Sequence, residues 1–320
     1  MSEPSVIHTV SPVRVKKKKS FFALLWEQRH LVILSTPFIL LIVMFTFVPL
    51  WGWILAFMNY NVAKGIFASQ FVGFKNFIDA FSSYDYWFAL RNTFAISVLK
   101  MVTSYFFTIL LALTLNEVRM IVFKRVVQTV SYLPYFVSWV VAANIVYGVL
   151  SPTRGIVNTL LTSAGIVEQG IPFMGIPSLF WIIVAMTNVW KNVGYGAIIY
   201  LSAMTSIDPE LYEAASIDGA GRLKRIRYIT LPGIMPMVRI LLILSLGNII
   251  NAGFEQVYLL RNPMVDTMAR TIEVYVYDYA LRYLRFSYGT AIGMTNSVIS
   301  LILVLSANYV SKKVSGEGLI

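Results

Sequence analysis

The chain has 320 residues, of which 58% are hydrophobic and only 13% are charged. Its mean hydropathy is +0.71, and soluble domains carry roughly twice this charged fraction, so a water-soluble globular domain is excluded. The sequence contains no cysteine, which excludes a disulfide framework and thiol chemistry.

Apolar runs dominate the sequence from about residue 32 onward. Six of them hold about twenty or more residues, which is enough to cross the hydrocarbon core of a membrane as a helix. They lie at about 32–58, 88–115, 127–150, 178–204, 236–258 and 289–310. Because the runs are continuous rather than alternating strands, a β-barrel is excluded. The sequence predicts an all-α, polytopic membrane protein with six transmembrane helices.

The basic side chains predict how the chain is oriented. The formal net charge is +11, and, with the N-terminus inside, the inner segments hold 15 Lys and Arg against seven in the outer loops. Cytoplasmic segments are enriched in these residues, so both termini are expected in the cytoplasm. The run KKKK at 16–19 then indicates topology and contact with lipid headgroups rather than with nucleic acid.

This orientation divides the chain into successive segments. The first span is expected to be retained, because it is too long for the core of a signal peptide and lacks an A-x-A cleavage site. The predicted segments are a basic cytoplasmic N-terminal segment at 1–30, a first transmembrane helix at 31–60, an extracytoplasmic loop at 61–87, a five-helix core at 88–310 with a cytoplasmic loop at 205–235, and a cytoplasmic tail at 311–320.

The predicted outer segments lie at about 59–86, 151–177 and 259–288, and the first of them is rich in aromatic residues. Aromatic side chains at a membrane interface are typical anchors. In the last segment Tyr275, Tyr279 and Tyr283 recur every four residues and form a stripe on one helix face. The stripe indicates either packing against neighbouring helices or a docking surface for a partner.

The sequence lacks the usual signals of catalysis and metal binding. It has no G-x-x-x-x-G-K-[ST] phosphate-binding loop, and its only histidines, His8 and His30, precede the first span. Together with the absence of cysteine, this removes His/Cys metal sites and the usual Ser–His or Cys–His catalysis. We therefore expect no catalytic residue, no metal site and no cofactor bound by this chain, and a function other than that of an enzyme.

One polar segment, YEAASIDGAGRLKRIRYITLP at 212–232, interrupts the apolar runs on the inner side. Just before it, Asp208 is a suitable N-cap and Pro209 suits the first helical position, so a short helix is expected to begin here. Gly219 and Gly221 then break this helix through a tight turn or the close approach of another backbone.

A second short helix, RLKRIRYIT, follows and leads to Pro232, where the next span is entered. It has an apolar side and four basic side chains, which predicts a helix–turn–helix lying across the cytoplasmic mouth. On physical grounds this unit is either an interfacial hairpin on lipid headgroups or a surface covered by a protein partner.

The spacing within this segment resembles that of a known family. Glu213-Ala214-Ala215, three residues, Gly219, nine residues and Ile229-x-Leu231-Pro232 form the pattern E-A-A-x3-G-x9-I-x-L-P. The pattern is similar to the cytoplasmic loop of permease subunits from binding-protein-dependent ABC importers. The resemblance covers roughly residues 30–315, and segments such as QTVSYLPYFVSWVV and GNIINAGFEQVYLL look like the carbohydrate-uptake branch, closest to permeases for complex oligosaccharides derived from polysaccharides.

The resemblance implies a type I ABC importer permease fold and a set of partners. These are a second homologous permease subunit, two copies of a cytoplasmic P-loop ATPase that bind ATP and Mg, an extracytoplasmic solute-binding protein docked on the outer segments, an oligosaccharide substrate and the lipid of a bacterial cytoplasmic membrane. The resemblance further implies that 208–221 is the coupling helix, seated in a cleft of the ATPase. The residues thereby assigned to ATPase coupling are Glu213, Ala214, Ala215, Asp218, Gly219, Ile229, Leu231 and Pro232.

Polar side chains inside the apolar spans mark the expected sugar pathway, because they are costly in lipid unless they line a cavity. The candidates are Lys100, Asn188, Trp190, Lys191, Asn192, Tyr195, Asn248, Asn251, Glu255 and Gln256. Aromatic rings would stack on sugar C–H faces, and amides would satisfy hydroxyls. The alternative is that these residues pair with one another to hold the helices together, for instance Lys191 with Glu255.

Two further functions stay open beside oligosaccharide import. A permease for another solute class would share the loop pattern, and an ion-coupled secondary sugar carrier would need an ion-coupling site and repeated halves, neither of which the sequence displays. We predict a permease subunit that forms half of the membrane pathway of an ATP-driven oligosaccharide importer and works by alternating access.

Overall fold

The computed structural model describes residues 26–247 and 249–315. Most of the basic N-terminal segment, the end of the C-terminal tail and the pathway candidate Asn248 lie outside the described residues. The chain divides into two compact units, Met1–Gly52 and Trp53–Ile320.

The first unit contains a long apolar helix. It comprises α2 (Arg29–Ile42), a π-helical turn η1 (Val43–Phe47) and the start of a 3-10 segment η2 (Val48–Phe57), which continues into the second unit. No side chain of α2 is buried within the chain, so lipid or another protein must cover this apolar surface.

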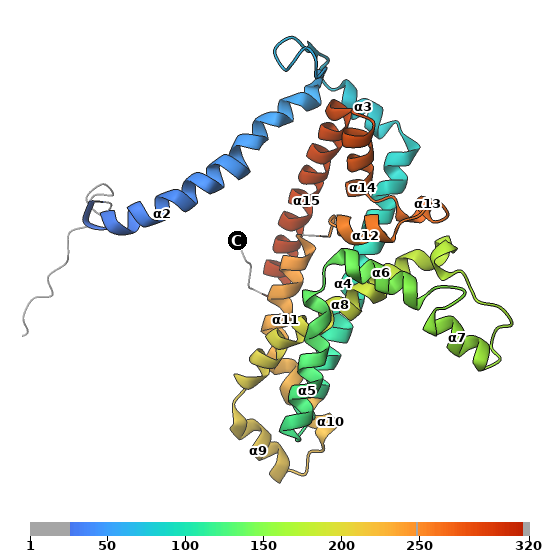
Figure 1. Cartoon of the computed structure of the whole chain (residues 1–320). Coiled ribbons are helices and arrows are strands. Elements are labelled where there is room, and N and C mark those ends of the chain that lie inside the picture. The colour runs from blue at the N-terminus through green and yellow to red at the C-terminus, as the bar shows by residue number, and fades with distance from the viewer. Residues whose placement is uncertain (1–25, 248, 316–320) are drawn as a thin grey trace, which may run out of the picture. The chain divides into compact units, whose positions relative to one another are not determined.

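The second unit is built almost entirely from helices and short helical turns (Figure 1). Its elements in chain order are β1 (Met58–Asn59), β2 (Gln70–Phe71), α3 (Lys75–Phe81), α4 (Tyr84–Glu117), α5 (Ile121–Tyr132), η3 (Leu133–Phe136), α6 (Trp139–Val149), α7 (Ile156–Ser163), η4 (Phe173–Gly175), α8 (Pro177–Thr205), α9 (Pro209–Ile217), α10 (Arg222–Arg225), η5 (Ile226–Thr230), α11 (Leu231–Leu246), α12 (Phe254–Leu260), α13 (Asp266–Ala269), α14 (Ile272–Tyr277), η6 (Asp278–Arg282) and α15 (Phe286–Ser315). The two short strands pair antiparallel, with Met58 opposite Phe71.

The predicted count of six transmembrane helices is not confirmed. In the described part of the chain, four helices are long and apolar enough to cross a membrane, and a bent pair formed by α5–η3 and α6 makes at most five. The four are Arg29–Phe57, Tyr84–Glu117, Arg222–Leu246 and Phe286–Ser306. The helix α8 is 29 residues long but is absent from this set, because Asn188, Lys191 and Asn192 lower its hydropathy.

Two of the predicted spans are not continuous helices. The run predicted at 127–150 bends by 108° between Phe136 and Trp139. The run predicted at 236–258 ends its helix at Leu246, and α12 begins only at Phe254, after a left-handed Gly253 with φ of +86°. Hydropathy measures only how apolar a run is, so it does not detect where the backbone leaves the helix.

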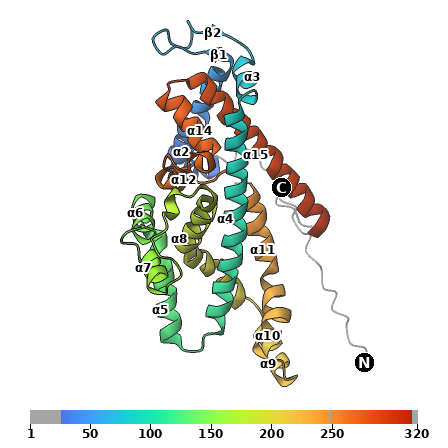
Figure 2. The same ribbon diagram turned by 90° about the vertical axis from the view of Figure 1, so that its right-hand side faces the viewer.

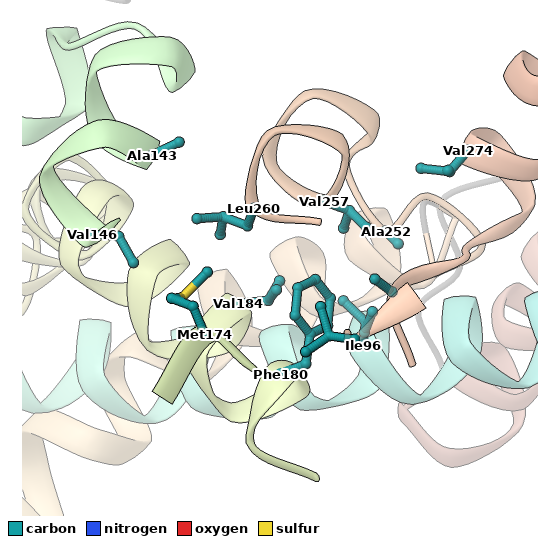
Figure 3. Close-up of a cluster of buried hydrophobic side chains, with 12 residues drawn as sticks. Ile96, Ala143, Val146, Met174, Phe180, Val184, Ala252, Val257, Leu260 and Val274 are labelled. Carbon is teal, nitrogen blue, oxygen red and sulfur yellow. The ribbon is translucent and has the colours of Figure 1, made fainter. Parts of the chain in front are cut away.

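The packed interior joins helices that are distant in sequence. Its main cluster of buried apolar side chains brings together α4, α6, α8, α12 and α14 (Figure 3). Phe180 and Val184 of α8 lie within it, beside Ile96 of α4 and Val257 of α12. The helix α8 packs along α4, and α11 packs against α8 (Figure 2). This core fixes the helices that carry the polar candidates.

Candidate functional site

The short helix α9 begins as its sequence predicts. The Asp208 side chain accepts a hydrogen bond from the backbone N–H of Glu210 at 2.9 Å, and Pro209 occupies the first turn. An N-cap of this kind satisfies a backbone donor that the helix itself leaves unpaired. The sequence therefore determines this helix locally, without help from distant contacts.

A glycine turn ends α9. Gly219 has φ of +72°, and the N–H of Ala220 donates to the carbonyl of Ala215 at 2.8 Å, which is the pattern of a Schellman C-cap. Gly221 has an ordinary φ of −66°, and a Cβ at either glycine would meet no atom within 4 Å. The expected turn is confirmed at Gly219, whereas in the described part of the chain no backbone approaches either glycine closely.

The second helix of the segment runs directly into the next span. From Arg222 to Leu246 the chain is one helical stretch, with a π-helical turn at η5. In that turn the N–H of Leu231 donates to the carbonyl of Ile226, five residues back. Pro232, which has no N–H to donate, follows this π-helical turn inside the continuous stretch.

The residues of the E-A-A pattern divide into two groups. Glu213, Ala214, Asp218, Gly219 and Pro232 are exposed, whereas Ala215, Ile229 and Leu231 are half-buried. Two hydrogen bonds join α9 to the helical stretch that follows the turn. The Tyr212 hydroxyl meets the Thr230 hydroxyl at 3.0 Å, and Arg225 donates to the Ser216 hydroxyl at 3.0 Å. The result is a defined helix–turn–helix whose first helix has an uncovered outer face.

A cavity of about 330 Å³ lies among α4, α8 and α11. Its walls are mostly apolar but carry several hydroxyl and amide groups, and we call it the polar cavity. Asn192 lines it together with Ser104 and Tyr105, and the Tyr105 hydroxyl meets the Ser245 hydroxyl at 2.6 Å. Asn188 donates to the Ser104 hydroxyl at 2.8 Å, and Asn192 donates to the Asn188 side chain at 3.0 Å. Sequence reasoning missed Ser104, Tyr105 and Ser245, because a hydroxyl inside an apolar run gives only a weak signal.

Lys191 lies in the concave side of the bent span. Its ammonium donates to the carbonyls of Val137 at 2.6 Å, Tyr135 at 2.7 Å and Pro134 at 3.3 Å. Only 6% of Lys191 is exposed, and all three of its donors are used. The Pro134 carbonyl also accepts from the backbone N–H of Val137 at 3.2 Å, so Lys191 chiefly serves the carbonyls of Tyr135 and Val137 at the bend. The suggested ion pair between Lys191 and Glu255 does not form, because Lys191 is occupied at the bend and Glu255 is exposed.

The neighbouring turn of α8 also contacts the bent span. Tyr195 stacks on Tyr135 with ring centroids 4.0 Å apart and planes inclined by 7°. A Cβ at Gly194 would lie 2.0 Å from the carbonyl oxygen of Ser131, so only glycine permits this approach of α8 to α5. Trp190 lines a separate apolar cavity of about 430 Å³ between α6 and α8.

The remaining pathway candidates surround the break between α11 and α12. Lys100 donates to the carbonyl of Ala252 at 2.8 Å, and Asn251 accepts from the N–H of Gly253 at 3.0 Å. Gln256 is buried and donates to the carbonyl of Val184 at 2.6 Å, so it ties α12 to α8 and does not line the polar cavity. The structure therefore disperses the candidates. Asn188 and Asn192 lie at the polar cavity, Trp190 lines the apolar cavity, and Glu255 is exposed. The others contact the backbone or rings at or near the two breaks, namely Lys100, Lys191, Tyr195, Asn251 and Gln256.

Comparison with known proteins places these features in a family. A profile of the family described as "binding-protein-dependent transport system inner membrane component" matches residues 104–316. The chain belongs to this family. The permease is accordingly a membrane component of a transport system rather than an enzyme. Among the described residues, no group of three or more His, Cys, Asp or Glu side chains is placed to hold a metal ion.

Individual relatives agree with this assignment. The permease is 38% identical over 300 residues to protein LplB of Bacillus subtilis (strain 168), which covers 94% of each chain. It is also 38% identical over 304 residues to the polygalacturonan/rhamnogalacturonan transport system permease protein YteP of the same organism, which covers 95% of this chain and 94% of that protein. A chain in the crystal structure of a bacterial ABC transporter involved in the import of the acidic polysaccharide alginate matches with a TM-score of 0.84 and 35% identity, covering 92% of this chain and 99% of that chain. This match confirms the predicted type I importer permease fold.

The last predicted outer segment of the permease is held by ion pairs and tyrosines. Arg261 pairs with Asp278 at 2.8 Å and with Asp266 at 3.4 Å, and all three side chains are at least three-quarters buried. Tyr275 is fully buried against Tyr279, and burial raises the pKa of the Tyr275 hydroxyl to about 12. The first part of the tyrosine stripe therefore packs inside the permease, which confirms the packing interpretation there.

Proposed function

We propose that this permease forms half of the membrane pathway of an ATP-driven importer for oligosaccharides derived from polysaccharides. Its two similar Bacillus relatives cover nearly its whole length, and one is named for the transport of polygalacturonan and rhamnogalacturonan. The matching solved transporter imports alginate, and a second crystal structure captured it with a periplasmic protein carrying an alginate pentasaccharide. These names support a polymeric-sugar substrate class.

The observation that carries the coupling part of the proposal is the uncovered helix α9. It is capped at both ends, lies between two apolar helices and exposes Glu213 and Ala214. The small Ala214 side chain allows close contact with another protein, and the Glu213 carboxylate offers a partner for a cation. We propose that α9 seats in a cleft of a P-loop ATPase and that Asp218, Gly219 and the half-buried Ala215 support this contact.

The partners and the orientation follow from this docking. A second homologous permease would complete the pathway, and two ATPase copies would bind ATP and Mg. The proposed orientation places α9 and both termini in the cytoplasm, which agrees with the excess of Lys and Arg in the same segments. Closure of the ATPase dimer would then move the docked helices and switch the pathway from inward-facing to outward-facing.

The polar cavity among α4, α8 and α11 is the part of this chain best suited to touch a sugar. Asn192, Ser104, Tyr105 and Ser245 supply both donors and acceptors there, which hydroxyl groups require. Tyr195 lies on the same helix α8 as Asn192 and stacks on Tyr135 of η3, and Tyr195 is 43% exposed, so its ring is open to one side. A solute-binding protein would deliver the sugar to the outer segments at 59–86, 151–177 and 259–288.

The proposal is tested by purifying the tagged permease gently from its native membrane and identifying the proteins that accompany it. We expect a second permease and a P-loop ATPase, and ATP hydrolysis by this complex should be stimulated by an oligosaccharide together with its binding protein. A panel of uronic-acid and neutral oligosaccharides then identifies the substrate class.

A charge reversal makes the test specific to α9. Glu213→Lys should abolish sugar-stimulated ATP hydrolysis while the permease still inserts, and Glu168→Lys, the same change at an exposed position of a predicted outer segment, should not. If the permease purifies alone and moves sugar along an ion gradient in liposomes, it is a secondary carrier and the proposal is wrong. If only a different solute stimulates hydrolysis, the sugar assignment fails and the coupling assignment remains.

A further inference from the structure

A large cavity lies where three helix ends meet. The helix α4 ends at Glu117, α5 begins at Ile121, and the long helical stretch that contains α10 begins at Arg222 (Figures 1 and 2). Together these ends surround a cavity of about 670 Å³. It is about twice as large as the polar cavity among α4, α8 and α11, and it shares no residue with it.

The walls of this cavity are apolar along the helices and charged at the helix ends. Leu110 and Leu113 of α4 and Phe123 of α5 form the apolar wall. The charged end is lined by two basic residues and one acidic residue, namely Arg119, Arg222 and Glu117. The apolar wall extends about 10 Å along the axis of α4, from Leu110 to the end of the helix, which is about a third of the thickness of a hydrocarbon core. A ligand that fits must therefore have an anionic end and an apolar body of at least this length.

Contacts within the chain do not close this cavity. Arg222 reaches Glu117 only at 4.0 Å, with side chains that are 58% and 27% exposed, and such solvent-exposed pairs contribute little stability. Among the described residues, no carboxylate lies within ion-pair distance of Arg119. The apolar wall is poorly suited to water, and Phe123 is 54% exposed.

We propose that this cavity binds one anionic phospholipid, with its phosphate on Arg119 and Arg222 and an acyl chain along Leu110, Leu113 and Phe123. Two cations at the rim of an apolar cleft between helix ends are complementary to such a lipid, and basic pockets between membrane helices on the cytoplasmic side bind anionic headgroups. The assignment to the inner leaflet rests on the orientation proposed above.

A lipid at this place links two parts of the permease that few protein contacts join. One wall belongs to the α4–α5 hairpin, and the other belongs to α10, directly after the turn at Gly219. The bound lipid would therefore set the position of the coupling segment relative to α4, so that anionic lipid raises the efficiency with which ATP hydrolysis drives transport.

The test uses the complete complex that the tagged permease brings with it, studied by native mass spectrometry during titration with phosphatidylglycerol and with phosphatidylcholine of the same acyl chains. Each Lys or Arg near a headgroup changes affinity by about fivefold, so Arg119→Gln should weaken phosphatidylglycerol binding about fivefold and leave phosphatidylcholine unchanged. Arg125→Gln removes the same charge from an exposed position of α5 that does not line the cavity and should change neither. Leu113→Trp fills the cavity and should displace the lipid without changing the charge.

Each contrary outcome overturns the proposal. Equal losses in Arg119→Gln and Arg125→Gln would mean that the surface attracts anionic lipid without a site. Competition by inorganic phosphate or by soluble glycerol phosphate would identify a site for a free anion. Binding that appears only after the ATPase is removed would identify a protein interface. Because the readout is lipid mass, these outcomes are independent of whether the complex transports a sugar.

Discussion

Lys191 offers the sharpest test of how the bent span is held. Its ammonium satisfies three backbone carbonyls at the bend between η3 and α6 and is itself buried. Lys191→Met keeps a similar length and apolar stem but removes every donor. The carbonyls of Tyr135 and Val137 would then lose the ammonium from which they accept, and the weaker contact to Pro134 would be lost as well.

The size of the effect follows from these distances. Leaving a buried acceptor unpaired costs about 1–3 kcal/mol, so the two short bonds, at 2.6 and 2.7 Å, give about 2–6 kcal/mol. The variant no longer buries a charge, which offsets part of this loss, so we expect about 2–4 kcal/mol of destabilisation. At about 2–4 °C per kcal/mol, the melting temperature should fall by about 5–15 °C.

The measurement is thermal unfolding of the purified permease complex, followed by size-exclusion chromatography of heated samples. Lys191→Arg retains the charge and several donors and should recover part of the loss. Lys75→Met is the control, because it makes the same change at an exposed lysine; its melting temperature should change little. If Lys191→Met melts within 2 °C of the unmodified protein, or no lower than Lys75→Met, this account of the bend is wrong.

Three further predictions concern single positions. Gly219→Val forces a β-branched residue to φ of +72° and should uncouple sugar-stimulated ATP hydrolysis, whereas Gly221→Val, at φ of −66°, should lose much less; equal activities would contradict the turn assignment. Gly194→Leu places a side chain 2.0 Å from the Ser131 carbonyl and should destabilise the permease by about 1–3 kcal/mol in thermal unfolding, and an unchanged melting temperature would refute the close approach. Tyr195→Ala removes an exposed ring from a stacked pair and should raise the sugar concentration needed for half-maximal ATPase stimulation while basal hydrolysis persists; an unchanged concentration dependence would exclude the ring from the pathway.

The coupling segment could be predicted because its determinants are local. Asp208 and Pro209 start a helix and Gly219 ends it through side-chain and backbone preferences that need no distant partner. The spacing of the E-A-A pattern then identified the segment as the cytoplasmic loop between two spans. The structure has the predicted cap, helix and turn at these residues. Gly221 is the exception, because it was expected to help break the helix but has an ordinary φ of −66°.

The pathway was predicted less well because its determinants are distant in sequence. Lys191 and Gln256 are polar residues in apolar runs, which indicates either a cavity or a helix contact, and both proved to donate to backbone carbonyls of other helices. Whether such a residue lines a cavity or contacts another helix depends on where the neighbouring span bends, and hydropathy does not reveal a bend. The hydroxyls of Tyr105 and Ser245 were missed because a single hydroxyl hardly changes the hydropathy of an apolar run.

The central claim is that the face of α9 bearing Ala214 contacts an ATPase, and the absence of cysteine allows a direct measurement. Ala214→Cys, and as a control Ala164→Cys in a predicted outer segment, each give the chain a single exposed thiol for a short photoactivatable cross-linker. In the native membrane Ala214→Cys should cross-link to a P-loop ATPase and Ala164→Cys should not. Cross-linking of Ala214→Cys to lipid alone, or to the ATPase no more than Ala164→Cys, would contradict the claim.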